Sequence, residues 1–207
     1  MEKQLIISVG REFGSGGHEI AEYLAETFHL PLYDRNLLGE VIMEKNPAFK
    51  KSELEELERY DELTKNPLFS RTIRGYNNSP EENIAEMQFE YLQKKAKQGE
   101  SFVIVGRCAE TVLKGYPGLV SIYILADAEV KTERIARING ISRMEAEVLR
   151  KRTDRERKSY HNYYCVHKWG DSRNYDICMN SSRLGIPGTA EVLADYIGQR
   201  SGVKMES

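Results

Sequence analysis

The sequence lacks several features that would assign it at once to a common class of protein. It has only three cysteines, Cys108, Cys165 and Cys178, which are widely spaced and odd in number. That usage argues against a disulfide framework. No apolar run approaches the roughly 20 residues needed to cross a bilayer. The first apolar stretch is short, has no small-residue cleavage site and runs directly into Arg11 and Glu12, so we expect no signal peptide and a cytoplasmic protein.

The chain also lacks a net charge of either sign. It contains 30 basic and 32 acidic residues among 207, a formal net charge of −2. This balance argues against a global nucleic-acid-binding or membrane-binding surface. We therefore expect no membrane partner and no nucleic-acid partner, and the sequence leaves a monomer and a homodimer equally open.

Short apolar segments alternate with helical patterns along the chain. The expected strands are Gln4–Gly10, Leu30–Tyr33, Phe102–Gly106, Val120–Leu125 and Tyr175–Met179. The expected helices are Glu19–Phe28, Arg35–Lys45, Glu81–Lys97, Ala109–Lys114, Ala128–Ile138, Arg143–Tyr164 and Thr189–Gln199. Apolar strands separated by helices predict an α/β fold around a buried parallel sheet. In such folds ligands bind at the carboxyl ends of the strands.

A glycine-rich turn, REFGSGGH, joins the first predicted strand to the first predicted helix. The backbone N–H groups of such a turn point to one place, where the helix dipole also favours negative charge. The turn therefore predicts a phosphate-binding site, although a tight strand-to-helix connection is the plainer interpretation. The candidate phosphate-binding residues are Gly14, Ser15, Gly16, Gly17 and His18.

This turn is missing a lysine. In the P-loop pattern G-x-x-x-x-G-K-[ST], the lysine reaches the β- and γ-phosphates and the hydroxyl holds Mg²⁺. Here Arg11 stands at the first glycine, Gly17 at the lysine and His18 at the hydroxyl position. Arg11 is the nearest cation that could replace the lysine. An ion pair between Arg11 and Glu12 explains the arginine equally well.

The magnesium ligands are also unassigned. A neutral His18 is a poor ligand for Mg²⁺, which prefers oxygen. The ion would be held by Ser15, by Asp34 or Asp127, or mostly by water and the nucleotide. No residue is therefore predicted as a committed metal ligand.

Two polar residues follow other predicted strands directly. Arg107 comes after FVIVG and Asp34 after LPLY, so both face the edge of the sheet where the glycine-rich turn lies. Arg107 is a candidate for binding an anion, with a surface ion pair as the alternative. Asp34 could cap the following helix, orient an acceptor group, or do both.

The segment from Arg143 onward is a long basic helix with an aromatic tail. Its cations and those just before it are Arg134, Arg137, Arg143, Arg150, Lys151, Arg152, Arg155, Arg157 and Lys158. A solvated helix face, an RNA-binding surface and a lid that carries arginines over a transferring phosphoryl group all fit this pattern. A second flap, Lys50–Ser79, carries Arg71 and Arg74, which either bind an acceptor or are ordinary loop residues.

His161, Cys165 and His167 lie close together in the sequence of the aromatic tail. Their spacing matches no common zinc pattern. A packed patch of Tyr160, Tyr163, Tyr164 and Trp169 is the favoured interpretation of this segment.

Taken together, these residues resemble the cytidylate-kinase-like proteins, a branch of the P-loop nucleoside monophosphate kinases, with a degenerate Walker A loop. The resemblance rests on ISVGREFGSGGHEIAEYLAE, LPLYDRNLL, FVIVGRCAETVL, RKRTDRERKSY and YDICMNSSRLG, and spans nearly the whole chain. It implies a single domain with a five-stranded parallel sheet flanked by helices. The implied core is 1–45, 100–140 and 173–200, with a monophosphate-binding insertion at 46–99 and an arginine-rich lid at 141–172.

The same resemblance implies phosphoryl transfer from ATP, with Mg²⁺, to a nucleoside monophosphate, most often CMP or dCMP. Residues 14–18 would hold the donor phosphates, and Asp34 and Arg107 would lie at the acceptor. The arginines that would close from the lid are Arg152, Arg155 and Arg157. Gly17 departs from the family's lysine, and Asp34-Arg35-Asn36 departs from its Asp-Ser/Thr-Gly turn. The alternatives are a nucleotide-binding sensor with little catalysis, or a small-molecule kinase with another acceptor.

Overall fold

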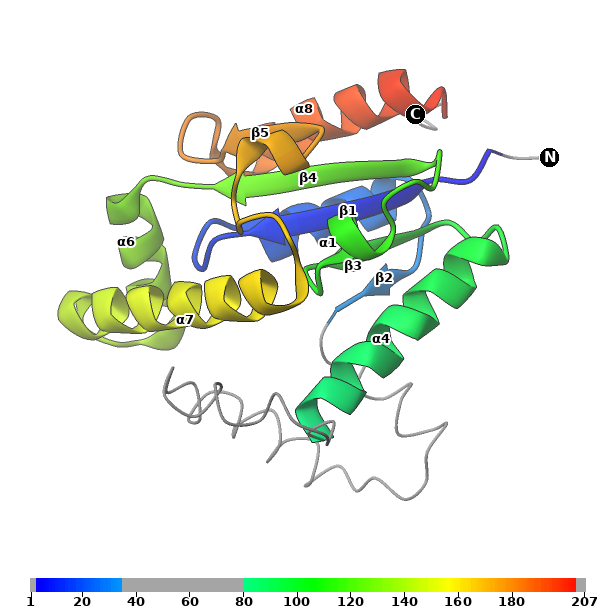
Figure 1. Cartoon of the computed structure of the whole chain (residues 1–207). Helices are drawn as coiled ribbons and strands as arrows, with labels where there is room; N and C mark the ends of the chain where they lie inside the picture. The colour runs from blue at the N-terminus through cyan, green and yellow to red at the C-terminus, as the bar shows by residue number, and fades with distance from the viewer. Residues whose placement is uncertain (1–2, 35–79, 204–207) are drawn as a thin grey trace.

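The computed structural model describes residues 3–34 and 80–203, and its elements follow the predicted alternation (Figure 1). The strands are β1 (Ile6–Arg11), β2 (Leu32–Tyr33), β3 (Phe102–Val105), β4 (Leu119–Leu125) and β5 (Ile177–Asn180). The helices are α1 (Gly17–Thr27), α4 (Pro80–Lys97), α5 (Ala109–Val112), α6 (Ala128–Asn139), α7 (Arg143–Tyr164), α8 (Gly185–Ser201) and the 3-10 helix η1 (Ser172–Asn174). The expected helix Arg35–Lys45 and the flap Lys50–Ser79, with Arg71 and Arg74, lie outside the described residues.

The sheet confirms the predicted α/β fold. Its five strands lie in the order β2-β3-β1-β4-β5, and every pair is parallel. Helix α8 begins at Gly185, four residues before the expected start at Thr189. The extra turn contains Pro187, which the first turn of a helix tolerates because its N–H groups have no intrahelical partner there.

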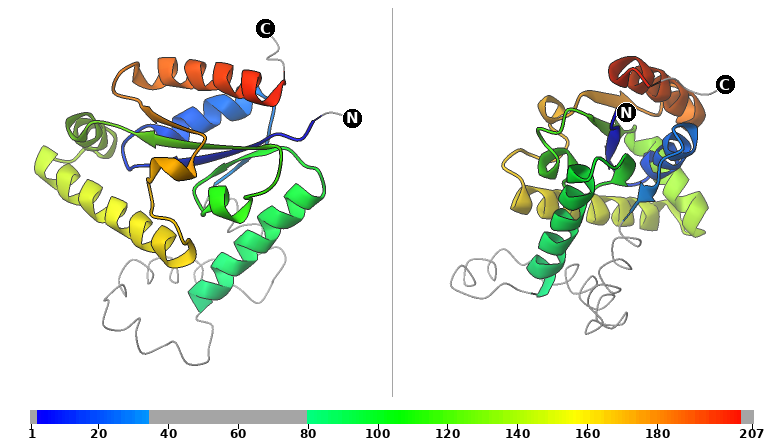
Figure 2. Two further views of the ribbon diagram at one scale, coloured as in Figure 1. Left: turned by 45° about the horizontal axis from the view of Figure 1, so that its top comes forward. Right: turned by 90° about the vertical axis from the view of Figure 1, so that its right-hand side faces the viewer.

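Helices cover both faces of the sheet (Figure 2). On one face, α1 and α8 pack Leu24, Leu193 and Ile197 against β1, β3 and β4. On the other, α4 and α5 pack Leu92 and Leu113 against β1 and β3. The strands β1, β3 and β4 are buried on both sides, which explains their near-continuous apolar sequences. Among the described helices, none is long and apolar enough to cross a membrane.

The two central strands end together and define the functional edge of the sheet. Gly10 and Arg11 of β1 lie opposite Tyr123 and Ile124 of β4. Helices α6 and α7 lie beyond the carboxyl ends of these strands, where Figure 1 shows α7 crossing below the glycine-rich turn. Ala146 and His161 are buried near the two ends of α7, so this helix is docked on the described core.

Helix α7 begins with a reciprocal capping box. Ser142 Oγ accepts a hydrogen bond from Glu145 N, and a Glu145 carboxylate oxygen accepts one from Ser142 N at 2.8 Å. We expect Ser142→Ala to lower the free energy of unfolding by about 1 kcal/mol, because the backbone N–H of Glu145 loses its acceptor. Urea unfolding measures this loss. Ser142→Thr keeps the hydroxyl and should preserve most of the stability; an equal loss in Thr and Ala would contradict the role of the cap.

Candidate active site

The glycine-rich turn is shaped by its own backbone. Gly14 and Gly16 have φ angles of 83° and 79°, in the left-handed region that favours glycine. A Cβ on Gly14 would also lie 2.9 Å from the carbonyl oxygen of Lys131. Helix α1 starts directly after Gly16 and has no side-chain cap. The N–H groups of its first turn are therefore oriented toward an anion that would approach this end of the helix.

The side chains of two predicted phosphate-binding residues contact other groups of the protein. The hydroxyl of Ser15 is buried and donates to the carbonyl of Glu12 at 2.8 Å, so it helps to fold the turn. His18 is exposed and forms an i,i+4 pair with Glu22 at 3.4 Å. The backbone N–H of Ser15 also donates to the carbonyl of Glu12, at 3.3 Å, so both polar groups of Ser15 stabilise the turn itself.

Arg11 occupies the space that a side chain at residue 17 would need. A Cβ on Gly17 would lie 2.5 Å from Arg11 Cβ and 3.0 Å from Arg11 Cγ. The guanidinium then rests against Gly106, whose φ is 76° and where a Cβ would collide with Arg11 Nη1. Arg11 therefore runs from the end of β1, across Gly17, to the end of β3. A lysine at residue 17 and an arginine at residue 11 exclude each other sterically.

Three arginines meet at this end of the sheet. Burial lowers the pKa of Arg11 well below its usual range, and the nearby charges of Arg157 and Arg107 lower it further, while Asp34 acts in the opposite direction. Arg157 donates to the carbonyl of Arg11 at 3.4 Å. The named charges around Arg11 are thus two cations and one carboxylate, which is the composition of a site for an anion.

Aromatic rings support two of these arginines. The guanidinium carbon of Arg157 lies 5.4 Å from the ring centroid of Phe13, and that of Arg107 lies 5.3 Å from the ring centroid of Tyr160. Such cation–π contacts hold each side chain in place. Both cations therefore have defined positions at this end of the sheet.

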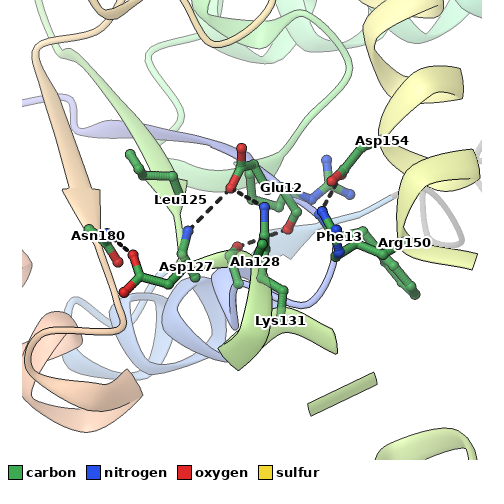
Figure 3. Close-up of polar contacts among 12 residues, drawn as sticks. Glu12, Phe13, Leu125, Asp127, Ala128, Lys131, Arg150, Asp154 and Asn180 are labelled. Carbon is green, nitrogen blue, oxygen red and sulfur yellow. Dashed lines mark hydrogen bonds and ion pairs between the residues drawn. The ribbon is translucent and has the colours of Figure 1, made fainter. Parts of the chain in front are cut away.

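A second set of contacts fixes the turn from its other side (Figure 3). Lys131 of α6 forms an ion pair with Glu12 at 2.6 Å, and Glu12 also accepts a hydrogen bond from Ala126 N at 3.2 Å. Asp154 of α7 accepts from Phe13 N at 2.7 Å. Burial raises the pKa of Asp154, and this hydrogen bond opposes the shift. The turn is thereby fastened to both α6 and α7.

These contacts revise the sequence-based interpretation of the charged residues. Glu12 forms its ion pair with Lys131, in place of the ion pair with Arg11 that the sequence had left open. Lys131 and Asp154 were not predicted. The signal for Asp154 lies in the spacing of Ala146, Arg150, Asp154, Arg157 and His161, which follow one another at intervals of three and four along α7. This spacing marks the face of the helix that faces the core.

The other two arginines of the predicted lid lie on the opposite side of α7. Arg152 and Arg155 are both exposed, and Arg152 pairs with Glu156 at 3.6 Å. The structure thus brings Arg157, rather than Arg152 or Arg155, next to Arg11. The roles of Arg152 and Arg155 stay predictions.

The aromatic tail is packed, as predicted, but in two places. Tyr164 contacts Tyr160 and Tyr163, with ring centroids 4.8 Å apart in both pairs. Trp169 instead packs against Tyr123 of β4, at 5.7 Å. The tail therefore contacts β4 through Trp169, while Tyr160 contacts Arg107.

Known structures share the fold of this protein. Among those with the same P-loop kinase fold are shikimate kinase from Bacteroides thetaiotaomicron, with 14% identity, a TM-score of 0.52 and coverage of 93% of this chain and 98% of that chain. A sugar kinase from a Janibacter species has 16% identity, a TM-score of 0.51 and coverage of 97% and 95%. At such identities the likeness establishes the fold alone.

The family follows from the sequence of the chain. The model of the cytidylate kinase-like family matches residues 6–183, so the chain belongs to this family. An uncharacterized protein from Eubacterium ventriosum ATCC 27560, known from its crystal structure, is 37% identical with a TM-score of 0.73, and the match covers 94% of this chain and 98% of that one. No curated protein matches the chain.

The steric exchange between residues 11 and 17 can be tested by stability. Because of the close contact with Arg11 Cβ, Gly17→Ala should lower the free energy of unfolding by about 1–3 kcal/mol. In the double variant Arg11→Gly, Gly17→Ala, the loss should be clearly smaller than the sum of the two single losses. Urea unfolding of all four proteins gives the coupling energy.

Gly198→Ala is the matched control for a helical glycine with ordinary space. Its Cβ would lie 3.4 Å from the carbonyl oxygen of Val203, so stability should stay the same or rise. Additive losses for residues 11 and 17 would show that Arg11 does not exclude a side chain at residue 17.

Proposed function

We propose that the protein transfers a phosphoryl group from ATP to a nucleoside monophosphate. The observation that carries this proposal is the meeting of Arg11, Arg107 and Arg157 beside a glycine-rich turn. Phosphoryl transfer needs little covalent help from the protein; it needs positioning and the neutralisation of spread negative charge. A backbone cradle with converging guanidinium groups supplies both.

Each residue has a proposed role in this reaction. The backbone N–H groups of Gly14, Gly16 and Gly17 bind the donor phosphates. Arg11 takes the part of the absent lysine and neutralises the phosphoryl group in transfer. Arg107, at the end of β3, binds the phosphate of the acceptor, and Asp34, at the end of β2, orients the acceptor.

Arg157 links the reaction to the position of α7. Its contacts with Arg11 and Phe13 place its charge at the transferring group only while α7 is docked on the turn. We propose that Arg152 and Arg155, on the outer face of the helix, contribute when the lid closes further. Charge brought over the phosphates by a mobile element is a recurring device in this chemistry.

The candidate magnesium ligands Ser15 and Asp127 contact other groups of the protein. Of the oxygen ligands considered from the sequence, Ser15 donates to Glu12, and Asp127 accepts from Asn180 at 2.9 Å and pairs with Arg183 at 3.2 Å. Asp34 is the acid that lies near Arg11. These residues do not form a ready set of ligands, so we assign the neutralising role to the arginines.

The acceptor is proposed from the family. Membership in the cytidylate kinase-like family favours a pyrimidine monophosphate, CMP or dCMP. Much of the predicted acceptor-binding insertion, 46–99, lies outside the described residues. The identity of the base must therefore be decided by experiment.

ADP release from Mg-ATP tests the reaction and its acceptor together. The acceptors are CMP, dCMP, UMP, dTMP, AMP, GMP and small hydroxyl compounds, and we expect stimulation by CMP or dCMP. Arg11→Ala and Arg157→Ala should each lower kcat by more than about tenfold, because a charge that stabilises the transition state is lost. Arg107→Ala should mainly raise KM for the acceptor.

Arg200→Ala, an exposed arginine at the far end of α8, is the control and should leave kcat unchanged. Unchanged kcat in both Arg11→Ala and Arg157→Ala would remove the arginines from the mechanism. Nucleotide binding by calorimetry without ADP release for any acceptor would point instead to a nucleotide-binding sensor.

A further inference from the structure

Four buried side chains meet at a place that the proposed reaction does not use. Cys108 and Glu110 come from the start of α5, and His161 and Cys165 from the end of α7. Their exposed fractions are 3%, 7%, 5% and 7%. His161 and Glu110 are 51 residues apart in sequence, so only the docking of α7 brings them together. Polar groups this deeply buried require partners.

The histidine is held by one nitrogen and left open at the other. His161 Nε2 lies 2.7 Å from Glu110 Oε1. Within the described part of the chain, the buried Nδ1 forms no hydrogen bond of normal geometry. Because Nε2 is engaged by the carboxylate, Nδ1 is the nitrogen that a metal ion would bind, after release of any proton it carries. A metal-binding histidine is held in this way, with its second nitrogen donating to a carboxylate.

Two thiols complete the cluster. The thiol of Cys108 interacts with that of Cys165, and both are buried. Ligand atoms of Glu110, His161 and Cys165 all lie within 4.8 Å of one another. In the described chain this is the one group of three or more such residues with that spacing.

We propose that Cys108, Cys165 and His161 bind a zinc ion, with Glu110 orienting the histidine through Nε2. Two thiolates and an imidazole are the donors that Zn²⁺ prefers over harder cations. The ion would also supply the positive charge that a buried thiolate and a buried carboxylate need. Sequence spacing missed the site because Cys108 and Glu110 come from another element, and because exposed His167 takes no part.

The position of this site gives it a structural consequence. Cys108 directly follows Arg107, and His161 follows Arg157 by one turn of α7. A metal bound by residues of both elements would tie the end of α7 to the loop after β3. The binding of the ion itself does not depend on the proposed phosphotransfer.

Cobalt titration tests the site. The reduced, metal-free full chain should bind one equivalent of Co²⁺ and show thiolate-to-cobalt charge-transfer absorption and the visible bands of tetrahedral Co²⁺, and Zn²⁺ should abolish both. Cys108→Ser and Cys165→Ser should lose the charge-transfer absorption. Cys178→Ser, at the cysteine outside the cluster, is the matched control and should keep it. Glu110→Gln should bind about 10- to 100-fold more weakly, because only the orientation of His161 changes.

Folding controls keep the result interpretable. Circular dichroism should show all variants folded, and Zn²⁺ should raise the melting temperature of wild type and Cys178→Ser but not of Cys165→Ser. Two outcomes would overturn the proposal: no cobalt absorption while thiol titration finds the cysteines reduced, or charge-transfer absorption that survives Cys165→Ser.

Discussion

One steric constraint shapes the whole site: the side chain of Arg11 lies where a side chain at residue 17 would have to be. The strand, and not the helix, therefore provides the cation closest to the turn. An arginine, rather than a lysine, also suits this position because Arg107 and Arg157 lie nearby. A lysine under burial and two like charges would lose its proton readily, whereas a guanidinium keeps its charge. Residues 17 and 106 are glycines because a Cβ at either position would collide with the side chain of Arg11.

The position of Arg157 depends in turn on how the turn is fastened to α7. The carboxylate of Asp154 accepts a hydrogen bond from the backbone N–H of Phe13. The ring of Phe13 in turn contacts the guanidinium of Arg157. Lys131 holds the neighbouring residue, Glu12, from α6. In the structure α7 is docked on the core along the face that carries Ala146, Asp154 and His161. The lid predicted for residues 141–172 stays a prediction.

The sequence was sufficient for the strands and for the position of the glycine-rich turn, because apolar runs and glycine-rich turns are local signals. Comparison with the Walker pattern placed Gly17 at the lysine position and suggested Arg11 as the replacing cation, a role that stays a prediction. It could not show that Arg11 covers Gly17, since that is a matter of side-chain path. Contacts such as Phe13 with Asp154, 141 residues apart, arise only when α7 docks on the sheet. The start of α8 was misplaced because Pro187 is harmless in a first turn.

Three arginines brought together in a folded protein repel one another, so the fold must hold them by other means. Rings under Arg107 and Arg157, a glycine surface under Arg11 and one nearby carboxylate do this without removing the positive charge. The arrangement is costly in the absence of an anion and becomes favourable when one binds. The contact between His161 and Glu110 holds the end of α7 against the loop after β3, and this also opposes the repulsion between the arginines. The stability of this edge of the sheet and its proposed affinity for phosphate are therefore two aspects of one charge distribution.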